Sequence, residues 1–299
     1  MTLFFIFYME GSVFYMDRHM IMITADERQE KLASLLYGKK KCCSWENYQS
    51  DKSSCEKVYV LPTPMSKLER DTLLTQKLKG ELINETNRVA CVFGGAIGQE
   101  WIRFFEGNNI RYYDFMKLPE VVEGNAHITA EATVAEVLRY SAYSVAGQQM
   151  LVTGYGACGS KIAKIFAGLG ADVTVAARRE SVRKQVIEDG LRSCDFLEIE
   201  HVIGEMHTVI NTVPTLVITE ELISRMSADS LIIDIASKPG GTDFEAASRY
   251  GITAKLSLGL PGIYTTTSSA KLLRDAIYKY APLQDDVREE QLWIFQIII

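Results

Sequence analysis

The chain has 299 residues, of which 47% are hydrophobic and 23% are charged, and its net charge is −6. This length accommodates about two domains, and the composition is typical of a soluble globular protein. The acidic balance and the lack of a basic run argue against a nucleic-acid-binding surface. Six scattered cysteines form no CxxC pair and no metal-ligand spacing, so we predict small buried thiols in a reducing compartment and no metal site.

Both ends of the chain are apolar. Residues 1–16 resemble part of a signal peptide but lack a basic start, and both they and the run 292–299 are too short to span a bilayer. We expect residues 1–19 to be an N-terminal extension of uncertain role and 283–299 to be a C-terminal tail. The protein is expected to be cytoplasmic, without a membrane partner.

Residues 20–124 alternate short apolar runs with amphipathic segments. The pattern predicts strands over 20–24, 58–61, 89–93 and 110–115, a helix over 27–37 and another that begins near Trp101. Such alternation is typical of a parallel sheet flanked by helices, and we predict a small flavodoxin-like α/β domain on the substrate side. Residues 41–56 are polar and poorly patterned, and we predict no element there.

Two strand ends of this first domain are candidate walls of an active site. Ligands of parallel sheets meet the carboxyl ends of the strands, which here are 62–66 and 94–98. The small residues of 94–98 lead into a helix amino terminus, which suits a carboxylate, although an ordinary strand-to-helix turn would look the same. The predicted substrate-binding residues are Thr63, Gly95 and Ala96.

The strongest local signal lies between Gln149 and Arg179, after a helix over 125–144 that we interpret as the link between domains. An apolar run ends in a GxGxxG motif, a helical pattern follows, and a β-branched run closes the segment. This context predicts a Rossmann dinucleotide-binding domain over 145–282, with the pyrophosphate on the helix amino terminus. The predicted cofactor-binding residues of the motif are Gly154, Gly156, Ala157, Cys158 and Gly159.

The end of the second strand of that segment bears on the choice of cofactor. An NAD site places Asp or Glu there to accept hydrogen bonds from the ribose, whereas this chain has Ala177 followed by Arg178 and Arg179. Two cations without a carboxylate suit a 2′-phosphate, so we predict NADP in preference to NAD. The alternative is a solvated strand end, with Glu180 as a late carboxylate.

The remaining pattern completes the second domain. It predicts helices over 181–189, 219–226, 243–250 and 268–280, and strands over 196–199, 208–210, 231–236 and 253–257. Two strand ends, 211–214 and 236–243, lie where the nicotinamide half of a dinucleotide would extend. A turn over 259–267 contains Thr265, a further predicted substrate-binding residue, which could bind an anion or simply cap the last helix. Further predicted cofactor-binding residues are Asn211, Thr212, Val213 and Pro214.

Several stretches, which together span about residues 20–280, resemble the A subunits of bacterial dipicolinate synthase, an enzyme of endospore formation. The most specific is the Ala-Ser-Lys-Pro-Gly-Gly-Thr-Asp-Phe run over 236–244, far more distinctive than the glycine motif itself. The other resembling stretches are 26–29, 125–126, 129–131, the glycine motif, 211–214 and 260–263.

The resemblance implies an NADP-dependent oxidation of dihydrodipicolinate, or of its hydrated precursor, to dipicolinate in the mother cell of a sporulating bacterium. It also implies a B-subunit partner, and a homo-oligomer is compatible with it. Lys238 is the leading candidate for carboxylate contact or proton transfer, with a structural lysine as the alternative. His127 is a weaker candidate for a catalytic base.

Three other functions remain open. A 2-hydroxy-acid dehydrogenase shares the architecture but uses a late histidine, and no histidine follows His207 in this chain. A shikimate-type or methylene-folate-type NADP dehydrogenase lacks the 236–244 motif. A nucleotide-sensing protein without turnover would explain the lack of an obvious acid–base pair.

Overall fold

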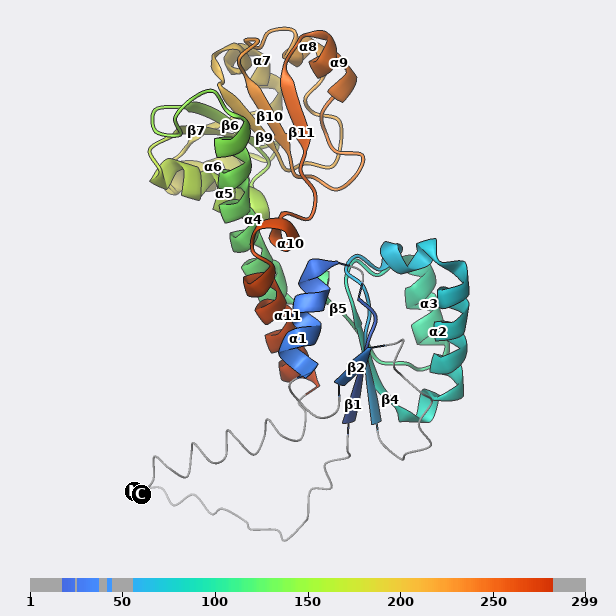
Figure 1. Ribbon diagram of the computed structural model, residues 1–299. Helices are drawn as coiled ribbons and strands as arrows, with labels where there is room; N and C mark the ends of the chain where they lie inside the picture. Colours follow the sequence, from blue (N-terminus) through green and yellow to red (C-terminus); the bar gives the residue numbers. More distant parts are fainter. Residues whose placement is uncertain (1–17, 25, 38–41, 45–55, 282–299) are drawn as a thin grey trace, which may run out of the picture. The chain divides into compact units, whose positions relative to one another are not determined.

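The computed structural model describes residues 18–24, 26–37, 42–44 and 56–281, and it divides the chain into two compact units (Figure 1). The first unit takes its described residues from Met1–Ala25, Ala33–Phe115 and Arg274–Ile299, and the second consists of Asp26–Leu32 and Met116–Leu273. Both units contain a parallel sheet with helices, so the α/β class is confirmed. Most of the predicted extension and all of the predicted tail lie outside the described residues.

The first unit is built on five parallel strands in the order β2-β1-β3-β4-β5. This is the flavodoxin-like order, as predicted. The strands are β1 (Arg18–Met22), β2 (Cys42–Ser44), β3 (Glu56–Val60), β4 (Val89–Gly94) and β5 (Tyr112–Asp114). Figure 1 shows α2 (Thr72–Asn84) and α3 (Gln99–Gly107) on one face of this sheet, whereas α1 (Glu27–Tyr37) is divided between the two units.

The core of the first unit is rich in aromatic residues. Trp101 and Phe105 lie four positions apart on α3, so they face the same side of the helix and both are buried against the sheet. On the sheet itself, the ring of Phe93 stacks against those of Tyr113 and Phe115 at 5.0 and 5.5 Å. These contacts hold β4 and β5 together, and β4 leads into the turn that contains the predicted substrate residues Gly95 and Ala96.

The second unit is built on six parallel strands in the order β11-β10-β9-β6-β7-β8. Counted from β6, the order is that of the Rossmann fold, with the reversal between β6 and β9. The Rossmann prediction is therefore confirmed. The strands are β6 (Gln149–Thr153), β7 (Asp172–Ala176), β8 (Arg192–Cys194), β9 (Thr208–Asn211), β10 (Leu231–Asp234) and β11 (Thr253–Leu256).

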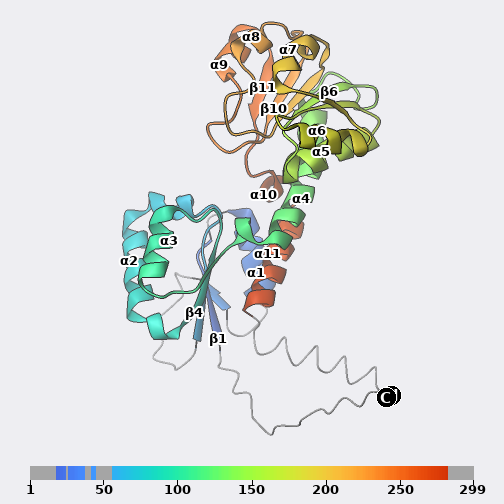
Figure 2. The same ribbon diagram turned by 180° about the vertical axis from the view of Figure 1, so that it is seen from behind.

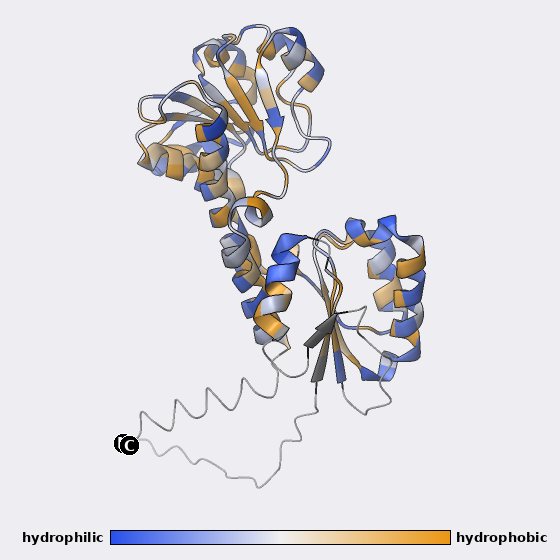
Figure 3. Cartoon of the chain, viewed as in Figure 1, coloured by the Kyte–Doolittle hydropathy of each residue, from blue (hydrophilic) through white to orange (hydrophobic). Residues whose placement is uncertain are grey.

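Alternating residues of these strands face two separate cores. Met150 and Val152 pack on one side with residues of α4 (Pro119–Tyr140), α5 (Ala157–Gly168) and α6 (Glu180–Glu188). Leu151 packs on the other side with residues of α7 (Ile199–Val202), α8 (Glu220–Ile223) and α9 (Phe244–Arg249). Figure 2 shows this unit from behind, and Figure 3 shows the hydrophobic residues along its central strands, in contrast to the more polar β11 at the edge. Because both faces are covered, ligands reach the sheet at its carboxyl edge.

Several expectations about the elements differ from the structure in detail, among them the prediction of no element over 41–56, where β2 lies. The strand predicted over 196–199 is a 3₁₀ turn, because the Asp195 and Glu198 side chains form a reciprocal capping box there, and the strand is β8 instead. The predicted turn over 259–267 contains a short helix, α10 (Leu260–Tyr264), before α11 (Thr266–Tyr280). The helix expected over 125–144 corresponds to α4, which begins at Pro119, ends at Tyr140 and falls in the second unit.

Candidate functional site

The glycine-rich loop after β6 has the geometry that a close backbone approach requires. Gly154 has φ +88°, a conformation that side chains rarely adopt. A Cβ at Gly159 would lie 2.3 Å from the carbonyl oxygen of Gly154, so only glycine allows α5 to pack this closely on the loop. A Cβ at Gly156 would meet no atom within 4 Å, which leaves space above the loop.

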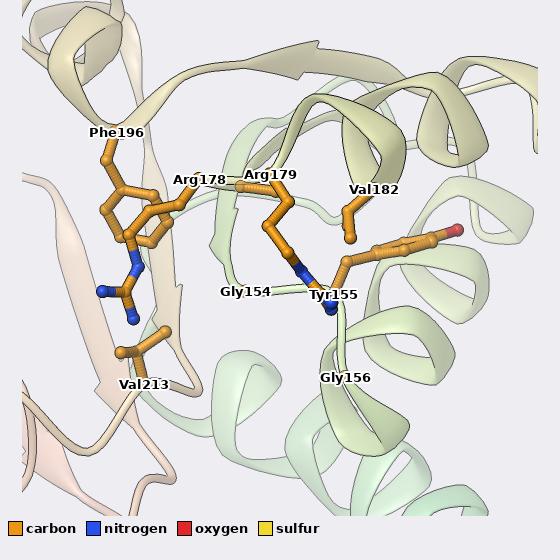
Figure 4. Close-up of a pocket in the computed structure, with 9 residues that line it drawn as sticks. Gly154, Tyr155, Gly156, Arg178, Arg179, Val182, Phe196 and Val213 are labelled. Atoms are coloured by element: carbon orange, nitrogen blue, oxygen red, sulfur yellow. The ribbon is translucent and has the colours of Figure 1, made fainter.

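A pocket of about 400 Å³ opens beside this loop (Figure 4). Figure 4 shows the Arg178 side chain between Phe196 and Val213, and Arg179 extending toward the glycine loop, while the Tyr155 ring points away beneath Val182. The lining residues come from the ends of β6, β7 and β9, from the start of α6 and from the turn after β8: Gly154, Tyr155, Gly156, Ala177, Arg178, Arg179, Val182, Phe196 and Val213.

The loop and the first turn of α5 fit a dinucleotide pyrophosphate. The helix begins at Ala157, and no side chain caps its amino terminus. Its free amide groups and the open space above Gly156 therefore suit an anion. Cys158 is half-buried on the first turn of α5, and burial raises the pKa of its thiol. A thiol that stays protonated does not act as a nucleophile.

The charges of the pocket are positive. Arg178 and Arg179 are exposed, and the Arg178 guanidinium lies 5.9 Å from the centre of the Phe196 ring. Glu180 instead pairs with Lys184 at 2.8 Å on the surface of α6. None of the nine residues that line the pocket in the described structure is Asp or Glu, so no carboxylate is placed there for a ribose 2′-hydroxyl.

The loop after β9 is held by Asn211, whose side chain is fully buried. Its Oδ1 accepts hydrogen bonds from Thr153 Oγ1 at 2.6 Å and from the amide of Val213 at 3.1 Å, and its Nδ2 donates to the Val213 carbonyl at 3.0 Å. The Thr212 hydroxyl donates to the Thr153 carbonyl at 2.7 Å. The side chain of Asn211 therefore shapes the loop, and of the predicted residues 211–214 only Val213 lines the pocket.

The distinctive 236–244 motif is organised by Asp234, a buried carboxylate at the end of β10. It accepts hydrogen bonds from the amides of Ala236 (3.0 Å) and Gly241 (2.8 Å) and from the Thr242 hydroxyl (2.8 Å). A Cβ at Gly241 would lie 2.4 Å from the Val213 carbonyl oxygen, so this motif packs directly on the loop after β9. Lys238 is exposed at the tip of this motif and does not line the pocket.

In the first unit, the turn that was predicted to bind a substrate carboxylate already binds a carboxylate of the protein itself. The carboxylate of Asp114 accepts hydrogen bonds from the amides of Ala96 (2.9 Å) and Ile97 (3.1 Å). Ala96 has φ +49°, in the left-handed region that residues other than glycine rarely adopt. Thr63 is buried against Gly95, and a Cβ placed on Gly95 would lie 2.2 Å from the methyl group of Thr63. The expectation that the amide groups of this turn are open to a substrate carboxylate is therefore wrong at Ala96 and Ile97.

Two other candidates lie elsewhere. Thr265 belongs to the second unit, and its hydroxyl donates to the Pro261 carbonyl at 3.3 Å, four residues earlier in the chain, rather than accepting from an amide of the last helix. His127 is exposed on α4 and lies 3.4 Å from Glu123. Within the part of the chain that the structure describes, no group of His, Cys, Asp or Glu could hold a metal ion, and no helix is both long and apolar enough to cross a membrane.

One polar cluster carries no signal in the sequence. The carboxylate of Glu136, which is buried on α4, accepts hydrogen bonds from the hydroxyls of Ser257 and Tyr264. These residues are 121 and 128 positions away from Glu136 in the chain. No local spacing connects them, so only the fold shows that a carboxylate and a phenol meet at this place.

Comparison with known proteins defines the class of the second unit. Residues 116–237 match the family described as D-isomer specific 2-hydroxyacid dehydrogenase, NAD binding domain. Together with the strand order and the glycine loop, this match assigns a nicotinamide-dinucleotide-binding domain of the dehydrogenase type.

Individual relatives agree with the resemblance predicted from the sequence. The chain is 33% identical over 178 residues to the A subunit of dipicolinate synthase from Bacillus subtilis (strain 168), an alignment that covers 60% of this chain and 56% of the relative. The crystal structure of the corresponding A subunit from Bacillus halodurans superimposes with a TM-score of 0.77 at 25% identity, covering 88% of this chain and 98% of the other.

A second crystal structure, that of the Bacillus subtilis A subunit, superimposes with a TM-score of 0.73 at 23% identity over 88% and 95% of the two chains. The sequence alignment, in contrast, spans little more than half the length of the curated relative. These similarities support an NAD(P)-dependent oxidoreductase.

Proposed function

We propose that this protein is the A subunit of a dipicolinate synthase, which oxidises dihydrodipicolinate, or its hydrated precursor, to dipicolinate with NADP. The observation that carries the cofactor choice is the pocket in which Ala177 stands where an NAD site has a carboxylate and is followed by Arg178 and Arg179. Similarity to the A subunits from two Bacillus species supports the substrate.

The chain's own residues would divide the work as follows. The amides at the start of α5 and the space above Gly156 would hold the pyrophosphate. Arg178 and Arg179 would bind the 2′-phosphate, with Ala177 leaving room for it. When bound, NADP supplies a hydride acceptor. Aromatisation of the ring drives the oxidation, so the protein mainly needs to align the substrate and hold its carboxylates.

Several substrate-side roles remain proposals. Lys238 is exposed on a loop at the carboxyl edge and would contact a carboxylate. Thr63 and Gly95 remain proposed substrate contacts of the first unit, and Thr265 remains a proposed substrate contact of the second unit. Ala96 would only shape the turn, because its amide, which was expected to meet the substrate, is hydrogen-bonded to Asp114. We further propose a B-subunit partner, the mother-cell cytoplasm as location and assembly with a second copy of the chain.

The test is the formation of NADPH when the purified chain meets freshly generated dihydrodipicolinate. The reaction would be followed at the nicotinamide absorbance band with NADP and with NAD, each with and without the B subunit. Reduction of NADP that is strongly weakened by Arg178→Ala supports the proposal. Tight NADP binding without reduction in any combination would favour a nucleotide sensor.

One specific observation favours a second candidate. The family match describes a 2-hydroxyacid dehydrogenase domain, so a panel of 2-hydroxy acids belongs in the same assay. Against this candidate, His207 is the last histidine of the chain. It is engaged through its Nδ1, which accepts from the Gln149 amide at 3.0 Å. Turnover of a 2-hydroxy acid faster than of dihydrodipicolinate would replace the proposed substrate.

A further inference from the structure

We infer that Tyr264 and Glu136 form a proton-accepting pair for the substrate, with Tyr264 as the catalytic residue that touches it and Glu136 as the positioning residue behind it. The pair lies in the second unit, outside the pocket that the two arginines line. The inference rests on the proposed function, because it names the residues that take up the proton which that oxidation releases.

Both oxygens of the Glu136 side chain are held in place by hydrogen bonds. Its side chain is buried, and its two oxygens separately accept hydrogen bonds from Ser257 and from Tyr264. A buried carboxylate is stable only when such donors replace water. The hydrogen bond to this carboxylate, together with burial, raises the pKa of the Tyr264 phenol. Tyr264 therefore remains a phenol and suits the role of passing a proton on to Glu136.

The position of the pair is the carboxyl edge of the Rossmann sheet. Ser257 directly follows β11, and its amide donates to the carbonyl of Asp234, the last residue of β10, at 2.7 Å. In the sheet, β6, β9, β10 and β11 are successive neighbours. The edge that begins at the glycine loop thus continues to this pair, and ligands of such sheets bind along that edge.

One cation, Arg139, accompanies the pair, and a second, Arg28, lies near Gly262 on α10. Arg139 is exposed one turn further along α4, and a hydrogen bond with Tyr264 is the main reason why its pKa is raised. Arg28 is largely buried in the same unit, and its Cβ lies 3.8 Å from the point that a Cβ on Gly262 would occupy. Guanidinium groups bind carboxylates through paired hydrogen bonds, so Arg139 is the nearer candidate for one carboxylate.

The proton and electron balance of the step is complete. Aromatisation of the dihydropyridine breaks one ring C–H bond by loss of hydride, which NADP accepts, and a neighbouring ring C–H bond by loss of a proton. The Tyr264 oxygen takes this proton while its own hydroxyl proton passes to Glu136. The substrate loses two electrons and two hydrogens, and Glu136 returns its proton to water after the product leaves.

The experiment uses the full chain together with the B subunit, and it compares wild type with Tyr264→Phe, Glu136→Gln and the control Tyr250→Phe. Tyr250 is exposed at the end of α9, on a different element from the pair, so the loss of its hydroxyl should change nothing. General acid–base catalysis contributes roughly 10²- to 10⁴-fold. We expect kcat to fall by this factor in Tyr264→Phe, with unchanged affinity for NADPH.

Further readouts separate catalysis from folding. For Glu136→Gln, we expect a similar loss of kcat at an unchanged KM and unchanged affinity for NADPH, because the Tyr264 hydroxyl loses the carboxylate that would take its proton. Arg139→Gln, at an exposed position, should raise KM and weaken dipicolinate binding in calorimetry by about tenfold or more. Thermal unfolding of each variant reports whether packing is preserved.

The outcomes are distinct. The inference is overturned, and the proposed function left intact, if the wild type is active and either Tyr264→Phe or Glu136→Gln keeps a kcat within about threefold of the wild-type value. A wild type that binds NADPH but never reduces NADP overturns the proposed function and the inference with it. If Tyr264→Phe folds and binds NADPH as wild type does but loses kcat, the result supports both the proposed function and the inference.

Discussion

Replacement of Arg178 by alanine tests the cofactor assignment most directly. A charge-assisted hydrogen bond contributes about 1.5–3 kcal/mol. Because Arg178 and Arg179 are exposed, the Coulomb attraction of each to a phosphate about 4 Å away lies nearer the aqueous value of about 1 kcal/mol than the buried one. We therefore expect each arginine to contribute about 1.5–2.5 kcal/mol, which is roughly a 10- to 70-fold change in the Kd of NADPH.

The assay is a titration of protein-bound NADPH fluorescence, repeated with NADH. Arg178→Ala should weaken NADPH by the stated factor and leave NADH within about threefold, since NADH has no 2′-phosphate. Lys184→Ala is the matched control, because Lys184 is a cation of α6 that pairs with Glu180 and does not line the pocket. Equal losses for NADPH and NADH, or an equal loss in the Lys184 variant, would refute a 2′-phosphate site at Arg178.

Three further changes test the structure around the site. Gly159→Ala should lower the free energy of unfolding by roughly 1–3 kcal/mol in urea, because the new Cβ would lie 2.3 Å from the Gly154 carbonyl oxygen. The control is Gly168→Ala on the same helix, where a Cβ meets nothing within 4 Å, and this change should be neutral or stabilising. Asp234→Ala should cost about 3 kcal/mol or more in the same measurement, because three donors lose their buried acceptor; a cost below about 1 kcal/mol would contradict this role. Tyr155→Phe should raise the pKa of Asp189 in an NMR titration, because the Tyr155 hydroxyl is the main cause that lowers it. The lowered pKa of Asp189 stabilises the folded state only while Asp189 is ionised. The loss of unfolding free energy in Tyr155→Phe relative to wild type should therefore be complete above about pH 4 and become smaller as the pH falls below that value.

The elements that could be predicted from the sequence are those whose signal is local. The segment around the glycine motif carries strand, loop, helix and strand within about 30 residues, and the structure has all four. The helix over Glu27–Tyr37 was predicted with the observed bounds. In contrast, β2 and β8 have three residues each, none of them β-branched or aromatic, so they carry no strand signal of their own. Their place comes from pairing with β1 and β7.

The parts of the site that could not be predicted depend on distant partners. The amides of Ala96 and Ile97 looked open in the sequence because their acceptor, Asp114, lies on the next strand. Asn211 looked like a cofactor contact, although its amide group is engaged by Thr153 and the Val213 backbone. In both cases, a polar residue at the correct edge of the sheet serves a neighbouring loop, and the sequence does not distinguish that use from ligand binding.

The contact of Gly241 with the loop after β9 has a consequence for engineering. Gly241 leaves no space for a side chain beside the Val213 carbonyl, and its amide is held by Asp234. Residues 211–215 and 234–242 therefore behave as one exchangeable module, although they are well separated in the chain. A chimera that takes one of these segments from a related dehydrogenase needs the other from the same parent, and a graft of either segment alone should fold poorly.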